Sequence, residues 1–159
     1  MNHFAATGPH FLISVRPEFA EKIVSKHKTV ELRRRFPELA SKGAHLLVYS
    51  SKPVGALVCR ANIKMAVKLP LSKLWKTYGS CACISKKAFS DYFSGAESGF
   101  AIVLENVSPL SRTIDSVALF QNFGIVPPQS YRYLAEEDWA LLSDEQFQAP
   151  HGHKRRNRS

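Results

Sequence analysis

The feature that most constrains the fold is a series of apolar, β-branched runs that alternate with turn residues. Such runs occupy residues 11–15, 45–51, 54–67 and 99–107, and proline, glycine or serine lies near the ends of each. Runs with this composition and these boundaries predict strands. Because helical patterns are few and do not alternate regularly with the strands, we expect an α+β protein, a small bent β-barrel of about five to six strands with flanking helices.

Helical patterns fill some of the connections between these strands. Pro17 suits the first turn of a helix, and the residues after it have apolar side chains at helical spacing. Ser108 and Pro109 indicate an irregular turn after the last long strand, followed by a brief extended segment at 113–115. The long strand is expected to bend near Asn62 or Lys64. The predicted helices comprise residues 17–26, 71–78, 85–93 and 134–147.

The 159 residues of the chain suit a single domain. We interpret residues 1–10 as an N-terminal arm, residues 11–147 as the domain and residues 148–159 as a basic tail. The tail has no large apolar residue, so we expect it to be disordered. Its cations are Lys154, Arg155, Arg156 and Arg158.

The composition argues against several classes of protein. Hydrophobic residues make up 45% of the chain and charged residues 22%, and no apolar run approaches the roughly 18 residues that a membrane span needs. The three cysteines have neither disulfide-framework nor zinc-site spacing, which indicates reduced thiols, and the N-terminus lacks a secretory pattern. We therefore expect a cytoplasmic, monomeric protein with no metal, no cofactor and no membrane partner.

The excess of basic residues indicates a polyanionic partner. The net charge is +9, and the tail contributes four of these charges, which leaves +5 for the rest of the chain. Much of that remainder lies at residues 26–35. A basic surface of this kind is typical of nucleic-acid-binding proteins, although solubility alone is the simpler alternative. We expect a nucleic-acid partner and favour RNA over DNA.

A charged segment at residues 28–35 is the first candidate site. Its sequence predicts a strand in which Thr29, Glu31 and Arg33 share one face, because side chains alternate along a strand. Successive positions on that face lie about 7 Å apart, so Glu31 and Arg33 can bracket a small planar polar group, with Lys28 entering from the preceding turn. The alternative is a solvated strand face with an ordinary ion pair.

A second candidate segment follows two prolines near the C-terminal end. Pro127 and Pro128 preset the backbone, and an amide, hydroxyls and a guanidinium come directly after them. We interpret this segment as a second recognition element; the alternative is a loop whose tyrosines cover one end of the barrel. The aromatic residues of the predicted helices could stack on bases, but their helical spacing favours core packing. They are Trp75, Tyr78, Phe89, Tyr92 and Phe93.

Residues 28–33 carry a family signature. Lys28, Glu31 and Arg33 match the pattern glycine, any residue, lysine, two of any, glutamate, any, arginine, with Lys26 at the glycine position. On this basis the sequence resembles the ASCH domains of the PUA-like superfamily. Over residues 11–134 it also looks like the PUA-like module of predicted transcriptional regulators. The resemblance implies a bent barrel with a cleft for RNA or a nucleobase-like ligand, and it places the three matching residues at that cleft.

The resemblance also leaves an enzymatic alternative open. Some ASCH proteins resemble amidohydrolases that act on acylated cytidine with a lysine, a threonine and a glutamate. Here Lys28 matches the lysine and Glu31 occupies the threonine's position, so Thr29 would be the substitute nucleophile. A ribonuclease could instead use Glu31 as base, with Lys28 or Arg33 stabilising the charge that develops on the phosphate.

The preferred hypothesis is a nucleic-acid-binding module that recognises RNA, or a single-stranded or modified base, in a cleft and has a regulatory role. A small hydrolase is the alternative, with Lys28, Glu31 and Thr29 as its catalytic candidates. A protein-binding role for the acidic helix at residues 135–145 is a third reading. The candidate ligand-binding residues are Arg16, Lys28, Glu31, Arg33, Arg34, Arg35, Ser51, Lys52, Gln129, Ser130, Tyr131 and Arg132.

Overall fold

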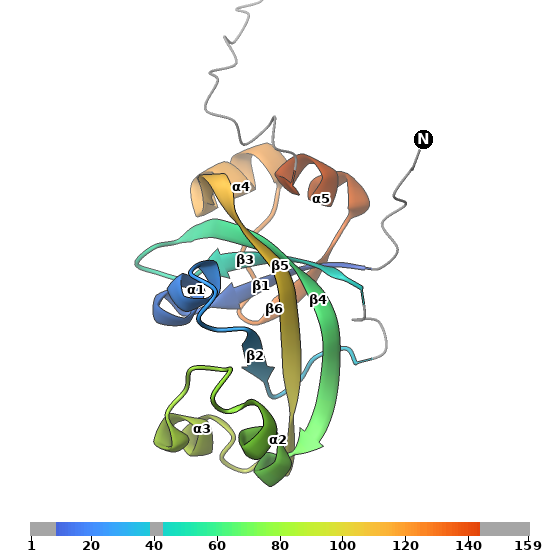
Figure 1. Cartoon of the computed structure of the whole chain (residues 1–159). Helices are drawn as coiled ribbons and strands as arrows, with labels where there is room; N and C mark the ends of the chain where they lie inside the picture. The colour runs from blue at the N-terminus through green and yellow to red at the C-terminus, as the bar shows by residue number, and fades with distance from the viewer. Residues whose placement is uncertain (1–8, 39–42, 144–159) are drawn as a thin grey trace, which may run out of the picture.

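The computed structural model describes residues 9–38 and 43–143, in which helices and strands are arranged around one strongly curved sheet (Figure 1). The predicted arm and tail lie largely outside these ranges. In chain order the elements are β1 (His10–Val15), α1 (Pro17–Val24), β2 (Val30–Arg33), β3 (His45–Ser50), β4 (Ala56–Pro70), α2 (Leu71–Tyr78), α3 (Lys86–Tyr92), β5 (Ser98–Asp115), α4 (Ser116–Phe123), β6 (Tyr131–Leu134) and α5 (Glu136–Ser143).

The sheet is six-stranded, in the order β2-β5-β4-β3-β1-β6. Only β1 and β3 pair in parallel, and every other pair is antiparallel. This confirms the predicted α+β class and strand number. The expected barrel is wrong in one respect, because β2 and β6 are edge strands and the sheet does not close. β2 has four residues and pairs with β5 alone, and no backbone ladder joins it to β6.

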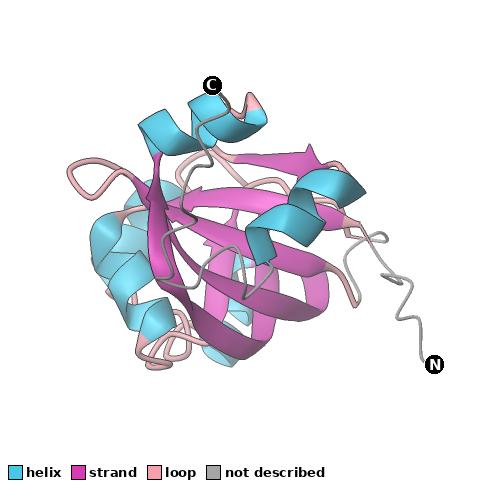
Figure 2. Ribbon diagram, turned by 90° about the horizontal axis from the view of Figure 1, so that it is seen from above, coloured by secondary structure: helices cyan, strands magenta, loops and turns pink. Residues whose placement is uncertain are grey.

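Helices cover both faces and one end of the sheet (Figures 1 and 2). One apolar cluster contains Phe11, Ile13 and Val48 and packs against Ala20 and Ile23 of α1. A second cluster, from the alternate residues of β1 and β3, lies under α4 and α5. A third joins α2 and α3 to β2 and β5. β1 and β3 are therefore buried on both faces, which is why their sequences read as continuous apolar runs.

Of the two long strands, β4 bends where the sequence predicts, whereas β5 is longer than expected. β4 has register shifts on both sides of Asn62, where a bend was predicted. β5 continues through Ser108 and Pro109, so the predicted turn there is wrong. The reason is that β2 pairs only with residues 100–103 of β5, which leaves the later part of β5 unpaired on that side. Proline is tolerated at such an edge because its missing N–H costs no ladder bond.

The turn between α1 and β2 brings the charged segment into the sheet. Lys26, which occupies the glycine position of the signature, adopts a left-handed conformation with φ of 66°. For a non-glycine residue this conformation costs about 1 kcal/mol. The backbone N–H of Lys28 then bonds to the carbonyl of Lys22 at 3.0 Å, which fixes the approach of Lys28 to the sheet.

Side-chain caps mark the starts of two helices, α3 and α4, of which α4 was not predicted. The side chain of Ser85 accepts a bond from the N–H of Ala88 and starts α3 where the sequence indicated. Asp115 caps α4 in the same way, and Gly124 ends that helix with φ of 66°. No helix within the described ranges is long and apolar enough to cross a membrane.

Candidate functional site

A pocket of about 570 Å³ lies between α1, β2 and α3, beside the C-terminal end of β1. The loop before β6 contributes to its wall. The charged segment at residues 28–35 and the candidate segment that follows Pro127 and Pro128 therefore meet at this pocket. The lining residues are Ser14, Val15, Arg16, Glu18, Phe19, Lys28, Glu31, Leu32, Arg33, Ile84, Ala88, Asp91, Tyr92 and Gln129.

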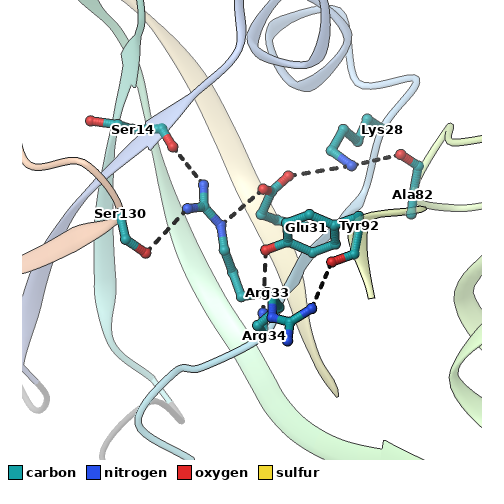
Figure 3. Close-up of polar contacts among 8 residues, drawn as sticks. All are labelled: Ser14, Lys28, Glu31, Arg33, Arg34, Ala82, Tyr92 and Ser130. Atoms are coloured by element: carbon teal, nitrogen blue, oxygen red, sulfur yellow. Dashed lines mark hydrogen bonds and ion pairs between the residues drawn. The ribbon is translucent and has the colours of Figure 1, made fainter. Parts of the chain in front are cut away.

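Glu31 lies at the centre of an ionic network in the wall of this pocket (Figure 3). Its Oε1 accepts a bond of 3.1 Å from Nε of Arg33, and its Oε2 lies 3.3 Å from Nζ of Lys28. The three residues are only 3% (Lys28), 7% (Glu31) and 9% (Arg33) exposed. Charged residues are rarely buried to this extent unless they are paired, so this arrangement differs from a solvated strand face.

Arg33 makes side-chain bonds across the open edge of the sheet, where no backbone hydrogen bonds join β2 to another strand. Its Nη2 donates to the carbonyl of Ser14 on β1 at 2.6 Å, and its Nη1 donates to Oγ of Ser130 at 3.4 Å (Figure 3). Ser130 is itself fixed, because its carbonyl accepts a bond from the N–H of Ser14. One guanidinium thus joins edge strand β2 to β1 and to the loop that precedes β6.

Lys28 is held from three sides. Its Nζ donates to the carbonyl of Ala82 at 2.6 Å, pairs with Glu31, and lies 4.9 Å from the centre of the Phe19 ring. Burial lowers the pKa of Lys28, while the Glu31 carboxylate acts in the opposite direction. A buried ammonium with a lowered pKa releases its proton more easily than an exposed lysine does.

Arg34 connects β2 to α3 at the rim of the pocket. Its Nη1 donates to the carbonyl of Tyr92 at 2.9 Å, and its backbone N–H bonds to the Tyr92 hydroxyl (Figure 3). The same Nη1 also donates to the carbonyl of Ser94 at 3.0 Å. Tyr92 is 40% exposed, whereas Phe89 and Phe93 on the same helix are buried. The Tyr92 ring is therefore available at the pocket, and the expectation that these aromatics serve the core fits the two phenylalanines.

The structure brings together part of the predicted set. Arg16, Lys28, Glu31, Arg33 and Gln129 line the pocket. Ser130 reaches it through its bond to Arg33, and Arg34 reaches it through Tyr92.

Other predicted residues lie elsewhere. Thr29 is exposed, precedes the first residue of β2 and does not line the pocket. Tyr131 packs against the rings of Phe11 and Phe36. Arg132 lies opposite Leu12 in the β1–β6 register, on the sheet face that α4 and α5 cover. Three further candidates, Arg35, Ser51 and Lys52, do not line the pocket.

Several pocket residues were not identified from the sequence. Ser14 had no distinguishing signal, because its contribution is a backbone carbonyl. Phe19 and Tyr92 come from helices whose aromatic residues also serve the core. A signal for Tyr92 existed, because its ring carries a hydroxyl that the neighbouring rings of Phe89 and Phe93 lack. Among the described residues, no group of three or more His, Cys, Asp or Glu side chains could hold a metal ion.

Comparison with known proteins identifies the family of this chain. Residues 11–121 match a family described as a domain of unknown function, DUF365. An ASCH domain-containing ribonuclease of Zymomonas mobilis is 37% identical over 132 residues, 82% of this chain and 88% of that protein. The crystal structure of ASCH from Zymomonas mobilis has a TM-score of 0.80 at 35% identity, covering 85% of this chain and 94% of that one. The chain therefore belongs to the ASCH-domain family, and its fold fits the PUA-like superfamily.

A more distant structure shows how far the fold extends. Human THYN1, in complex with DNA that contains 5-methylcytosine, has a TM-score of 0.50 at 12% identity, over 85% of this chain and 95% of that one. At this identity the likeness concerns the fold alone.

Proposed function

We propose that this protein binds single-stranded RNA in the pocket and cleaves it. The observation that carries the proposal is the buried Lys28–Glu31–Arg33 network in the wall of a pocket of about 570 Å³. The related Zymomonas protein that is named a ribonuclease supports the choice of RNA. A pocket of this kind takes up a base only after it has left its stack, which favours single strands over duplexes.

The network leaves donors that can read a base or hold a phosphate. Arg33 has five N–H groups, and three of them bond to Glu31, Ser14 and Ser130. Two N–H groups of Arg33 therefore remain for acceptors on the RNA. Tyr92, which is 40% exposed and lines the same pocket, offers its ring as a stacking surface.

In the cleavage step of this proposal, the 2′ hydroxyl attacks the adjacent phosphorus. The bond from phosphorus to the 5′ oxygen breaks, which leaves a 2′,3′-cyclic phosphate and a free 5′ hydroxyl. Lys28, whose pKa is lowered by burial, donates a proton to the leaving 5′ oxygen and regains one, through solvent, from the attacking hydroxyl. Arg33 stabilises the charge on the phosphoryl oxygens.

In this scheme Glu31 has a positioning role. Both of its oxygens already accept from Arg33 and Lys28, so it orients the two cations. This differs from the sequence-based hypothesis, in which Glu31 is the base. An amidohydrolase that uses Thr29 has less support, because Thr29 is exposed and does not line the pocket.

The test is a cleavage assay with three substrates of one sequence: labelled RNA, its DNA counterpart and its 2′-O-methyl counterpart. We expect cleavage of RNA only, with a cyclic phosphate product, because the other two lack a free 2′ hydroxyl. Lys28→Met should lower the rate by about 100-fold or more. The matched control is Lys64→Met, since Lys64 is an exposed lysine on β4. Intact RNA after incubation with wild-type protein, or equal rates for both variants, would contradict the proposal.

The finer parts of the sequence-based hypothesis stay predictions. A preference for a modified base, a role in transcription regulation, a cytoplasmic location and a monomeric state each require a separate measurement. The acidic α5 remains the expected surface for any protein partner, with Glu136, Glu137 and Asp138 in its first turn.

A further inference from the structure

A group of lysines extends from the rim of the pocket across α3 and α2. Lys86 and Lys87 begin α3, and Lys73 and Lys76 lie on α2. All four side chains are exposed. We call these four residues the lysine face. None of them belonged to the set of residues predicted from the sequence.

Two contacts in the structure connect this face to the pocket and α3 to α2. Asp91 lines the pocket, and its Oδ2 lies 2.9 Å from Nζ of Lys87. The next lysine, Lys86, has its Nζ 4.9 Å from the centre of the Trp75 ring on α2. The surface of α2 has a second hollow, which is lined by Ser72, Lys73, Lys76 and Thr77.

The contacts within the lysine face leave its charge available to a partner. Both partners of the Lys87–Asp91 pair are exposed: the side chain of Lys87 is 88% accessible and that of Asp91 is 67% accessible. Such pairs contribute little to stability, typically below about 1 kcal/mol, because water screens them. A phosphate group can therefore replace the Asp91 carboxylate as the partner of Lys87 at small cost.

The position of the lysine face in the molecule favours a polyanion. Asp91 is the only acidic residue between positions 71 and 92. The acidic first turn of α5 lies at the other end of the molecule from α2 and α3 (Figure 1). A charge distribution with a basic end and an acidic end orients an approaching polyanion toward the basic end.

We propose that the lysine face binds the phosphate backbone of the RNA strand whose base occupies the pocket. This inference rests on the proposed function and adds the direction in which the strand leaves the pocket, over α3 toward α2. The serine and threonine hydroxyls of the second hollow supply further donors to phosphate oxygens. The protein would then hold several nucleotides while it acts on one.

The test measures how affinity for an uncleavable 2′-O-methyl RNA of twelve nucleotides depends on salt, by fluorescence anisotropy. Each phosphate contact that is lost should reduce the slope of log affinity against log salt by about 0.7. We expect the double variants Lys73→Gln with Lys76→Gln, and Lys86→Gln with Lys87→Gln, each to reduce the slope by about 1.4. Thermal melts of the two variants check that each is folded.

The matched control replaces Lys64 and Arg112 by glutamine, since both are exposed cations on strands β4 and β5. It should keep the wild-type slope to within about 0.7, the effect of one contact. If both lysine-face variants have the slope of this control while wild-type protein binds and cleaves RNA, the lysine face is contradicted and the proposed function stands. If wild-type protein neither binds nor cleaves RNA, the proposed function itself fails.

Discussion

Glu31 is the residue on which the pocket depends, because it is the shared partner of two buried cations. Replacement by glutamine keeps the shape and removes the charge that compensates Lys28 and Arg33. Removing one partner of a buried pair typically costs about 3–5 kcal/mol. We therefore expect Glu31→Gln to lower the free energy of unfolding by about 3 kcal/mol, measured by urea denaturation.

The control for this prediction is the same chemical change in an exposed pair. Asp91→Asn removes the partner of Lys87, and this pair is open to water. Its effect on the free energy of unfolding should stay below about 1 kcal/mol. If the two substitutions have equal effects on stability, the network around Glu31 is less buried and less tightly coupled than the structure shows.

At the scale of single residues, alternation along a strand was sufficient to predict that Glu31 and Arg33 share a face. The same rule was extended to Thr29, but β2 begins only at Val30, and Thr29 is exposed. Ser14 could not be predicted, because the carbonyl that accepts from Arg33 depends on how β1 lies relative to β2. Such contacts are set by tertiary arrangement, which local sequence does not encode.

At the scale of elements, Arg34 fastens α3 to the end of β2 through the carbonyls of Tyr92 and Ser94. Arg34→Ala should loosen this attachment and increase hydrogen exchange at the amides of α3. The loss in global stability should be small, about 1 kcal/mol, because the bonds are exposed to water. Hydrogen exchange followed by mass spectrometry measures the effect.

Arg35 provides the comparison, since it is a neighbouring exposed arginine outside the pocket lining. Arg35→Ala should leave exchange in α3 at its wild-type rate. Equal exchange in the two variants would show that Arg34 does not hold α3, and the orientation of Tyr92 would then need another explanation.

The attachment of α5 to the sheet is expected to depend on pH. The rings of His10 and His45 stack with that of Trp139, and the two Nδ1 atoms lie 3.1 Å apart. Burial lowers the pKa of His10, the facing His45 lowers it further, and Glu136 acts in the opposite direction. Burial also lowers the pKa of His45.

The direction of the pH effect follows from these shifts. Below about pH 6.5 both histidines bind protons in the unfolded chain. They bind fewer protons in the folded protein, because their pKa values are lowered there. The free energy of unfolding therefore falls as pH decreases. We expect the melting temperature to decrease between pH 7.5 and pH 5, and to decrease less in His45→Phe. His27→Gln is the control, because His27 is exposed. An equal pH dependence in all three proteins would contradict this assignment.

Elements with strong local signals were predicted well, and those without them were not. α1 and α3 follow from Pro17 and Ser85 at their starts. α4 was not predicted, although Asp115 and Gly124 mark its ends. Pro109 is compatible with a strand only where a neighbouring strand is missing, and that depends on the length of β2.

At the scale of the whole molecule, the sequence predicted the class of fold correctly, but the expected barrel was wrong because the sheet is open. Strand patterns indicate which residues are buried, whereas the order β2-β5-β4-β3-β1-β6 depends on pairings between distant residues. The open edge bears on the proposed function, because the pocket lies beside edge strand β2, the end of β1 and the loop that precedes β6. Arg33 occupies that opening and makes side-chain bonds in place of a ladder.

The most direct measurement is a crystal structure of the protein with a short 2′-O-methyl RNA, which fills the site without being cleaved. The account predicts an unstacked base in the pocket, against the Tyr92 ring and within hydrogen-bond distance of Arg33, with Lys28 beside the adjacent phosphate. An RNA strand bound on another face, with the pocket around Glu31 left empty, would contradict it.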